Sequence, residues 1–167
     1  MRERNHEKGA KYQRHVKYWL DKRPFLGYDS DIFGDAYDVS CNATMIGGIS
    51  YDISMHLKKD HKTLRILYVE CKYRDEVSGT IDAEFREFLI KSYMAFKCAK
   101  NDDANAAQFC FISNIPPSKL YEFMRSPQQY IRSELDKNDV QIDNDQLLRL
   151  NDRIHVLILS KTILGVE

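Results

Sequence analysis

The chain has 167 residues, of which 43% are hydrophobic and 30% are charged, and its formal net charge is zero. This size and composition are typical of one globular domain with an apolar core. No apolar run reaches membrane-spanning length and the N-terminal residues are charged, so we expect neither membrane association nor a signal peptide. The four cysteines show no Cys-x-x-Cys spacing, which disfavours structural zinc and predicts a cytoplasmic protein.

Charge is distributed unevenly along the chain. Residues 1–23 carry eight Lys or Arg and three acids, a balance of +5, whereas residues 134–152 carry six acids and two bases, a balance of −4. A protein with zero net charge lacks the overall positive charge that is typical of many nucleic-acid-binding proteins. The asymmetry nevertheless permits a local basic face, and ordinary solvated surface is the alternative interpretation.

A first helix is predicted over residues 3–22, because apolar residues recur there at helical spacing and Pro24 follows. Gln13 flanks this apolar stripe, and a turn-rich connection over residues 24–31 comes next. The members of the stripe are Tyr12, Val16, Trp19 and Leu20.

Two strands are expected next, over residues 36–46 and 47–57. Each contains the pattern Tyr-Asp-hydrophobic-Ser, so each supplies a candidate aspartate, Asp38 in the first strand and Asp52 in the second. We favour Asp52 because its strand directly precedes the central one, and Asp38 is the alternative. Residues 58–63 then form a plausible hairpin loop.

The central strand is expected over residues 64–73, a run without Gly or Pro in which aliphatic and aromatic residues predominate. Strand alternation places Glu70 and Lys72 on one face and Cys71 on the other. Burying an unpaired charge is costly, so this pair indicates either a functional site or an ordinary ion pair. Together with Asp52, Glu70 would offer hard oxygen ligands to Mg²⁺ or Mn²⁺, and Lys72 could orient a nucleophile.

The remaining elements complete an α/β pattern. A helix over residues 80–100, a break at 101–105 and a buried strand at 108–113 indicate a crossover to a parallel strand. Within that helix, Arg86 and Lys91 are expected to be exposed to solvent. Further elements are expected as a helix from 118 toward 135 that is weak at Ser126–Pro127, an acidic loop at 136–145, a short helix at 146–150 and a strand at 153–160 in which His155 is structural.

The spacing of Asp52, a gap of seventeen residues and then Glu70-Cys71-Lys72 on a hydrophobic strand resembles the PD-(D/E)XK nuclease superfamily, the restriction-endonuclease-like fold. The longer sequence segment at residues 69–74 resembles the Mrr-like and restriction-enzyme branches of this superfamily. The resemblance covers roughly residues 5–115. It implies an α/β fold with an αβββαβ core, in which helices flank a central mixed sheet. Residues 116–167 would add a C-terminal helix and strand to this single domain of residues 1–167.

The same resemblance implies an Mg²⁺- or Mn²⁺-dependent endonuclease that hydrolyses phosphodiester bonds, expected in DNA and in restriction, defence or repair. Asp52 and Glu70 would hold the metal, with the backbone carbonyl of Cys71 as a further ligand, and Lys72 would position the attacking water. Many members carry a glutamate on the first helix, where this chain has Gln13. Gln13 and Asp38 are therefore the accessory candidates.

Double-stranded DNA is the expected partner. Because the protein has zero net charge, DNA binding must rely on a local basic face of the protein. We expect that face in the hairpin loop, near the active edge, and on the first helix. Two alternatives are a nuclease-like module that binds nucleic acid or a partner subunit without cutting, and cleavage of RNA. A homodimer and a module of a larger protein are both compatible with the sequence. The candidate contact residues are Lys58, Lys59, Lys62, Lys11, Arg14 and Lys17.

Overall fold

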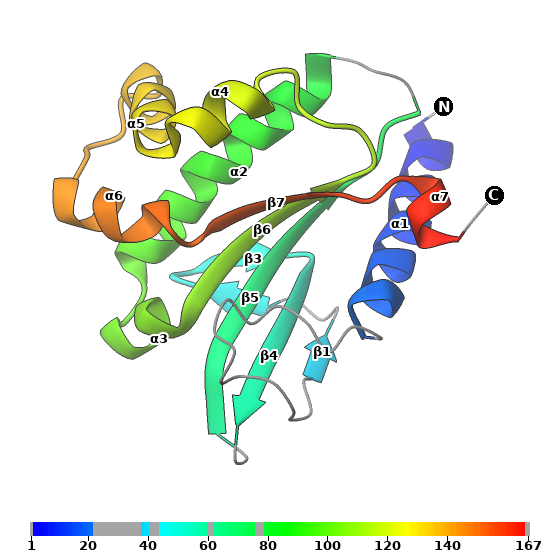
Figure 1. Ribbon diagram of the computed structural model, residues 1–167, viewed down its shortest axis with the longest axis horizontal. Coiled ribbons are helices and arrows are strands. Elements are labelled where there is room, and N and C mark those ends of the chain that lie inside the picture. Colours follow the sequence, from blue (N-terminus) through cyan, green and yellow to red (C-terminus); the bar gives the residue numbers. More distant parts are fainter. Residues whose placement is uncertain (1, 22–37, 41–43, 60–61, 76–78, 166–167) are drawn as a thin grey trace.

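The computed structural model describes residues 2–21, 38–40, 44–59, 62–75 and 79–165. The chain contains both helices and strands, and Figure 1 shows their arrangement. In chain order the elements are α1 (Arg2–Asp21), β1 (Asp38–Ser40), β2 (Thr44–Ile46), β3 (Ile49–Tyr51), β4 (Ile53–Lys59), β5 (Lys62–Lys72), α2 (Gly79–Cys98), α3 (Asn101–Ala106), β6 (Ala107–Ser113), α4 (Leu120–Arg125), α5 (Pro127–Lys137), α6 (Asn144–Asn151), β7 (Ile154–Ile158) and α7 (Lys161–Leu164).

Five strands form a mixed central sheet in the order β1-β4-β5-β6-β7. β1, β4 and β5 pair antiparallel, whereas β5, β6 and β7 pair parallel. Parallel neighbours need long crossover connections, which α2 with α3 supplies between β5 and β6, and α4–α6 supply between β6 and β7. The predicted crossover to a parallel strand is therefore confirmed.

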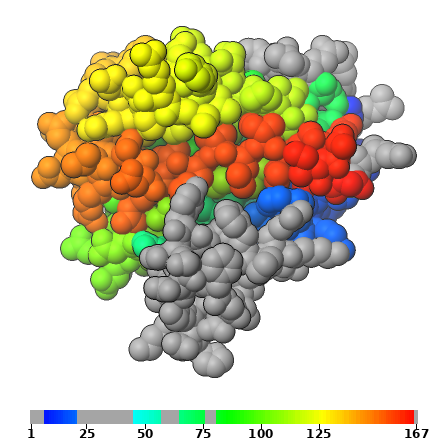
Figure 2. All heavy atoms as spheres, viewed as in Figure 1, coloured from blue at the N-terminus to red at the C-terminus, as the bar shows by residue number. Residues whose placement is uncertain are grey.

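Helices cover both faces of the sheet because alternate residues of β5 and β6 enter two separate apolar cores. On one face, Tyr68 and Phe111 pack with α2, α5 and α6. On the other face, Val69 and Ile112 pack against α1. Figure 1 shows α1 on one side and α2 with α4–α6 on the other, and Figure 2 shows β7 running across the surface between these layers. The chain is an α/β protein with a mixed central sheet flanked by helices, as predicted.

The two longest helices of the described part are α1 and α2, of 20 residues each. α1 buries the predicted stripe members Tyr12, Val16 and Leu20, and the other side chains described over residues 7–20 are exposed or half-buried. α2 buries a row of aromatic side chains that includes Phe85 and Phe88. In the residues that the structure describes, no helix is both long and apolar enough to cross a membrane.

The expected strands over residues 36–46 and 47–57 are wrong in their continuity. β1 belongs to the central sheet, whereas β2 pairs with β3 in a separate two-stranded sheet. The chain bends at Asp52 between β3 and β4, so Tyr51 packs in the core with α2 and Ile53 packs in the core with α1. The positive φ angles of Gly47 and Gly48 provide the two-residue turn between β2 and β3.

Three further boundaries differ from the expectation. β4 continues to Lys59 and β5 begins at Lys62, so most of the predicted hairpin loop is strand. Residues 101–105, predicted as a break, lie in the short helix α3. The predicted helix after residue 118 is divided into α4 and α5 at Ser126–Pro127, the expected weak point, because Pro127 lacks the N–H that an uninterrupted helix would use.

The turn between β2 and β3 can be tested by two neighbouring substitutions. A Cβ added at Gly47 would lie 2.3 Å from the carbonyl oxygen of Ala95 in α2, whereas a Cβ at Gly48 would meet open space. Both positions have positive φ, which costs an L-residue about 1 kcal/mol. We expect Gly48→Ala to cost about that much and Gly47→Ala to cost roughly 1–3 kcal/mol more through overpacking.

The free energy of unfolding by urea, measured for both variants, provides the comparison. Equal losses for Gly47→Ala and Gly48→Ala would show that the turn moves away from α2 without cost.

Candidate metal and catalytic site

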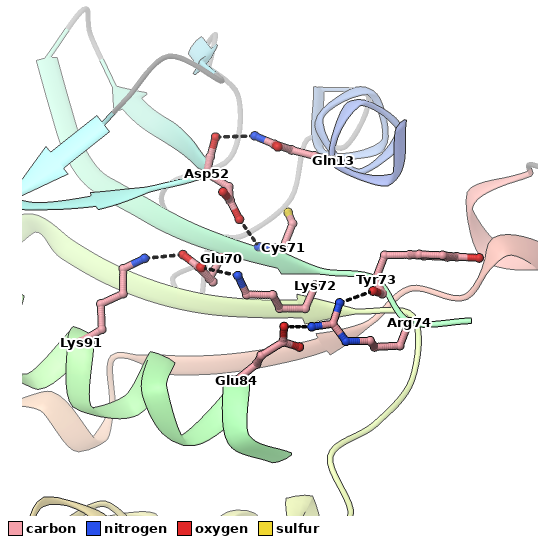
Figure 3. Close-up of polar contacts among 9 residues, drawn as sticks. All are labelled: Gln13, Asp52, Glu70, Cys71, Lys72, Tyr73, Arg74, Glu84 and Lys91. Carbon is pink, nitrogen blue, oxygen red and sulfur yellow. Dashed lines mark hydrogen bonds and ion pairs between the residues drawn. The ribbon is translucent and has the colours of Figure 1, made fainter. Parts of the chain in front are cut away.

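The bend before β4 and the end of β5 bring the three predicted site residues together (Figure 3). The Asp52 carboxylate accepts a hydrogen bond from the backbone N–H of Cys71, with 2.8 Å between Oδ2 and N. The Lys72 ammonium lies 2.8 Å from Oε1 of Glu70. The Asp52 carboxylate is thus held beside the β5 segment that carries the Glu70–Lys72 ion pair.

Alternation along β5 explains which side chains enter the site. Tyr68 and Glu70 face α2, whereas the side chains of Cys71 and Tyr73 pack on the opposite face with the α1 core. Cys71 thus serves packing through its side chain, as expected, and its backbone contributes the N–H that binds Asp52. The same residue carries the carbonyl that the family resemblance suggests as a metal ligand.

Glu70 has a second cationic partner that the sequence analysis missed. The Lys91 ammonium of α2 lies 2.5 Å from Oε2 of Glu70 and 4.4 Å from the ring centroid of Tyr51. Its side chain is only 27% exposed, so the expectation of a solvent-exposed Lys91 is wrong. The available sequence signal was its place beside the buried stripe of the helix, three residues after Phe88 and next to Ser92.

Opposite charges balance within this site. Glu70 is 9% exposed, and each of its carboxylate oxygens is paired with a lysine. Burial and then the charge of Glu70 raise the pKa of Asp52, while the Cys71 N–H and the two lysines oppose that rise. Burial beside Glu70 therefore disfavours the charged form of Asp52 in the metal-free protein.

The two accessory candidates occupy different places. The Gln13 side-chain amide of α1 donates to the backbone carbonyl of Asp52 at 2.9 Å and so ties the helix to the bend. Asp38 lies on the edge strand β1 opposite His56, four residues beyond Asp52 along β4, and its side chain is outside the described residues. The structure therefore brings Asp52, and not the backbone position of Asp38, beside Glu70.

The predicted nucleic-acid contacts divide into two groups. Ile53 pairs with Val69 beside the site, whereas Lys59 pairs with Lys62 at the far end of the same ladder, about 20 Å away at 3.3 Å per residue. The expectation that the hairpin lysines lie near the active edge is therefore wrong, because a hairpin joins the opposite ends of its strands. Their side chains are outside the described residues. The residues at this far end are Lys58, Lys59 and Lys62.

The α1 candidates lie closer to the site. Lys17 follows Gln13 by one helical turn and is half-buried, so it shares the face that touches the bend. Lys11 and Arg14 are exposed to solvent. Of the predicted contact residues, Lys17 is therefore the one that shares the helix face of Gln13.

A further clamp fixes the chain that leaves β5. Arg74 forms an ion pair with Glu84 of α2 (Figure 3). The backbone N–H of Arg74 donates to the Asn114 side-chain oxygen at 2.8 Å, and its carbonyl accepts from the Asn114 amide at 2.6 Å. This clamp holds the segment that directly follows Lys72.

The donor set suits a hard divalent cation better than zinc. In the described ranges, no group of three or more His, Cys, Asp or Glu side chains is arranged to hold a metal ion. Two carboxylates, Asp52 and Glu70, with a nearby backbone carbonyl are a typical partial shell for Mg²⁺, which keeps several water ligands and binds phosphate oxygens. The residues present therefore fit Mg²⁺ or Mn²⁺, provided that the cation replaces the lysines at Glu70.

Comparisons of the chain with family models, with curated proteins and with solved structures found no match. The central geometric fact is the hydrogen bond that joins Asp52 to the Glu70-Cys71-Lys72 segment.

The raised pKa of Asp52 has a consequence for stability. The folded protein takes up a proton at this group at a higher pH than the unfolded chain, whose aspartates titrate near about 3.9. The metal-free protein therefore gains stability as pH falls through the raised pKa and loses it as pH rises. We expect Asp52→Asn to stabilise the metal-free protein at pH 7 and to flatten this pH dependence.

Asp75 provides a control of opposite sign. Hydrogen bonds, first from Lys8 and then from Tyr73, lower the pKa of Asp75, so its contribution is present above the ordinary aspartate pKa and is lost as pH falls. Asp75→Asn should therefore reduce stability at pH 7. Urea unfolding with EDTA at pH 4.5 and 7 measures both variants, and destabilisation by Asp52→Asn at pH 7 would identify Asp52 as a structural residue.

Proposed function

We propose that this chain is an Mg²⁺- or Mn²⁺-dependent endonuclease of the PD-(D/E)XK type that hydrolyses phosphodiester bonds in DNA. The observation that carries the proposal is the hydrogen bond of Asp52 to Cys71, which sets one carboxylate beside the Glu70–Lys72 pair. The order of elements supports it, because α1, the antiparallel strands, the crossover helix α2 and the parallel strand β6 follow the αβββαβ pattern that the sequence resemblance implies.

Each residue of the site has a chemical task in this proposal. Asp52 and Glu70 would hold the cation, with the Cys71 carbonyl as a further ligand. A bound cation would polarise a phosphoryl oxygen and make water a stronger nucleophile. Lys72, released from Glu70, would orient the attacking water and offset the negative charge that develops on the phosphate. Gln13 would act as a positioning residue, since it holds the backbone of Asp52.

The two lysines have different tasks because different elements hold them. Lys72 follows Cys71 on β5 and so lies next to the segment that Asp52 binds. Lys91 projects from α2 and rests against the Tyr51 ring, away from that backbone contact. We infer that Lys72 serves hydrolysis, whereas Lys91 balances the buried charge of Glu70 when no cation is bound.

A second candidate function is binding of nucleic acid or a partner subunit without cleavage. The observation that favours it is the pairing of both oxygens of Glu70 with lysines, which already satisfies this carboxylate without a cation. The Gln13 amide in place of a helix glutamate points the same way, because the site then has one fewer anionic ligand.

The two lysines offer a matched pair of variants. Lys72→Met and Lys91→Met each remove one cation from the same carboxylate and keep an apolar stem of similar length. We expect Lys72→Met to lower the single-turnover rate of duplex DNA cleavage by at least about 100-fold, the usual effect of losing one transition-state contact. Lys91→Met should stay within about tenfold of the wild type, because it frees Glu70 for the cation.

The cleavage assay should use Mg²⁺ and Mn²⁺ separately, with an RNA duplex of the same sequence as a second substrate. Wild-type protein that binds DNA but cleaves neither duplex with either cation would favour the binding module. Equal cleavage by the wild type and Lys72→Met would place hydrolysis outside this site.

A further inference from the structure

Three arginines from separate parts of the chain meet at the end of the sheet opposite the candidate metal site. Arg65 belongs to β5, Arg149 to α6, and Arg153 precedes β7. All three donate to Asn105 of α3, Arg65 to its carbonyl at 3.4 Å, Arg149 to its side-chain oxygen at 2.8 Å and Arg153 to its carbonyl at 2.9 Å. Figure 2 shows α3 and the end of α6 side by side on one face of the molecule.

Neutral groups hold these guanidinium groups in place. Arg153 Nη1 also donates to the carbonyls of Ala104 and Ala107, at 3.1 and 3.0 Å, and its Nε donates to the Arg149 carbonyl at 3.2 Å. The guanidinium carbons of Arg149 and Arg153 lie 5.3 and 5.5 Å from the ring centroid of Phe96. These contacts fix the positions of the side chains without cancelling their charge.

The positive charge of the cluster has no close anionic partner. Among the described residues, no carboxylate oxygen lies within 4.0 Å of Arg65, Arg149 or Arg153. Burial lowers the pKa of Arg153, the charges of Arg65 and Arg149 lower it further, and Asp152 opposes them. Three like charges held together in this way repel one another, and a bound anion would relieve the repulsion.

Arg65 and Arg149 also keep donors for such an anion. Each uses a single terminal nitrogen of its guanidinium group for Asn105, and the other nitrogens form no further hydrogen bond within the described part of the chain. A guanidinium group presents its N–H donors in a planar fork that matches two oxygens of a phosphate. Arg153, by contrast, donates mainly to backbone carbonyls, and these hydrogen bonds fix its position in the cluster.

We propose that Arg65, Arg149 and Arg153 form a phosphate-binding site that takes the backbone of a nucleic acid, at a distance from the candidate metal site. The proposal rests on the proposed function for the choice of ligand and extends it, because it assigns a contact to the nucleic-acid backbone away from the candidate metal site. The backbone positions of Arg65 and Glu70 are five residues apart on β5, or about 17 Å along the strand. A duplex spans that distance with about five base pairs at 3.4 Å each.

The test compares Arg65→Gln/Arg149→Gln with Arg132→Gln. Glutamine keeps a donor for Asn105, and Arg153 stays unchanged because its loss would leave several carbonyls unpaired. Arg132 is a suitable control because it also donates to an asparagine side chain, Asn144 at 2.5 Å, but lies outside the cluster. Circular dichroism and Tm establish that the variants are folded, and fluorescence anisotropy with a 20-base-pair duplex in EDTA measures binding over a salt series.

We expect the double variant to bind roughly 10-fold more weakly at 0.1 M salt and its log–log salt slope to fall by nearly two units, about 0.9 for each lost phosphate contact. Arg132→Gln should bind like the wild type. A double variant with the affinity and slope of Arg132→Gln would overturn the proposal. The proposal would also be overturned if the wild type bound no DNA while inorganic phosphate shifted the NMR signals of the Arg65 and Arg149 side chains. The ligand would then be free phosphate.

Cleavage separates this proposal from the proposed function. Loss of binding in the double variant, together with no metal-dependent cleavage by the wild type, would support the arginine site and refute the nuclease. Unchanged binding in the double variant, together with cleavage that depends on Lys72, would refute the arginine site and support the nuclease.

Discussion

The hydrogen bond from the Cys71 N–H to the Asp52 carboxylate is the contact on which the candidate site depends. It joins a bend in the chain to the last residues of the central strand β5. Because the chain turns at Asp52, β3 leaves the central sheet and pairs with β2, while β4 continues beside β5. Gln13 of α1 holds the backbone of the same residue, so elements from three parts of the chain fix one carboxylate.

Charge balance is the second constraint on the site. Glu70 is nearly buried and would be costly to keep charged without the ammonium groups of Lys72 and Lys91. A divalent cation would supply the same compensation and would displace at least one lysine from the carboxylate. The two lysines therefore stabilise the metal-free fold and compete with the cation that the proposed function requires. This competition links stability to activity in a way that either lysine variant would expose.

The sequence predicted the parts of the fold that depend on local pattern. Alternation along β5 placed Glu70 and Lys72 on one face and Cys71 on the other, and the structure agrees. The bend at Asp52 was missed because residues 47–57 alternate without interruption, whereas the contacts of Asp52 with Cys71 and Gln13 join residues that are distant in sequence. Here tertiary contact overrides a clean strand pattern.

Contacts between distant residues were the other limit of the sequence. Lys91 meets Glu70 across 21 residues, and Arg149 and Arg153 meet Asn105 across 44 and 48 residues. The pattern of hydrophobic residues in the sequence does not predict such pairs, because each of these charged residues on its own resembles a solvent-exposed charge on a helix or a turn. The hairpin lysines show the opposite limit. They are close in sequence to the central strand, but they lie at the end of the β4–β5 ladder that is far from Glu70 and Lys72.

In the proposed function Asp52 and Glu70 together hold a divalent cation, and the position of Mn²⁺ in a crystal would show whether they do. Anomalous diffraction from crystals soaked in Mn²⁺ should show one peak about 2.1 Å from a carboxylate oxygen of each residue. Lys72, Lys91 or both should have moved away from Glu70. A structure in which both lysines keep their contacts with Glu70 and no Mn²⁺ peak lies between the two carboxylates would contradict the account.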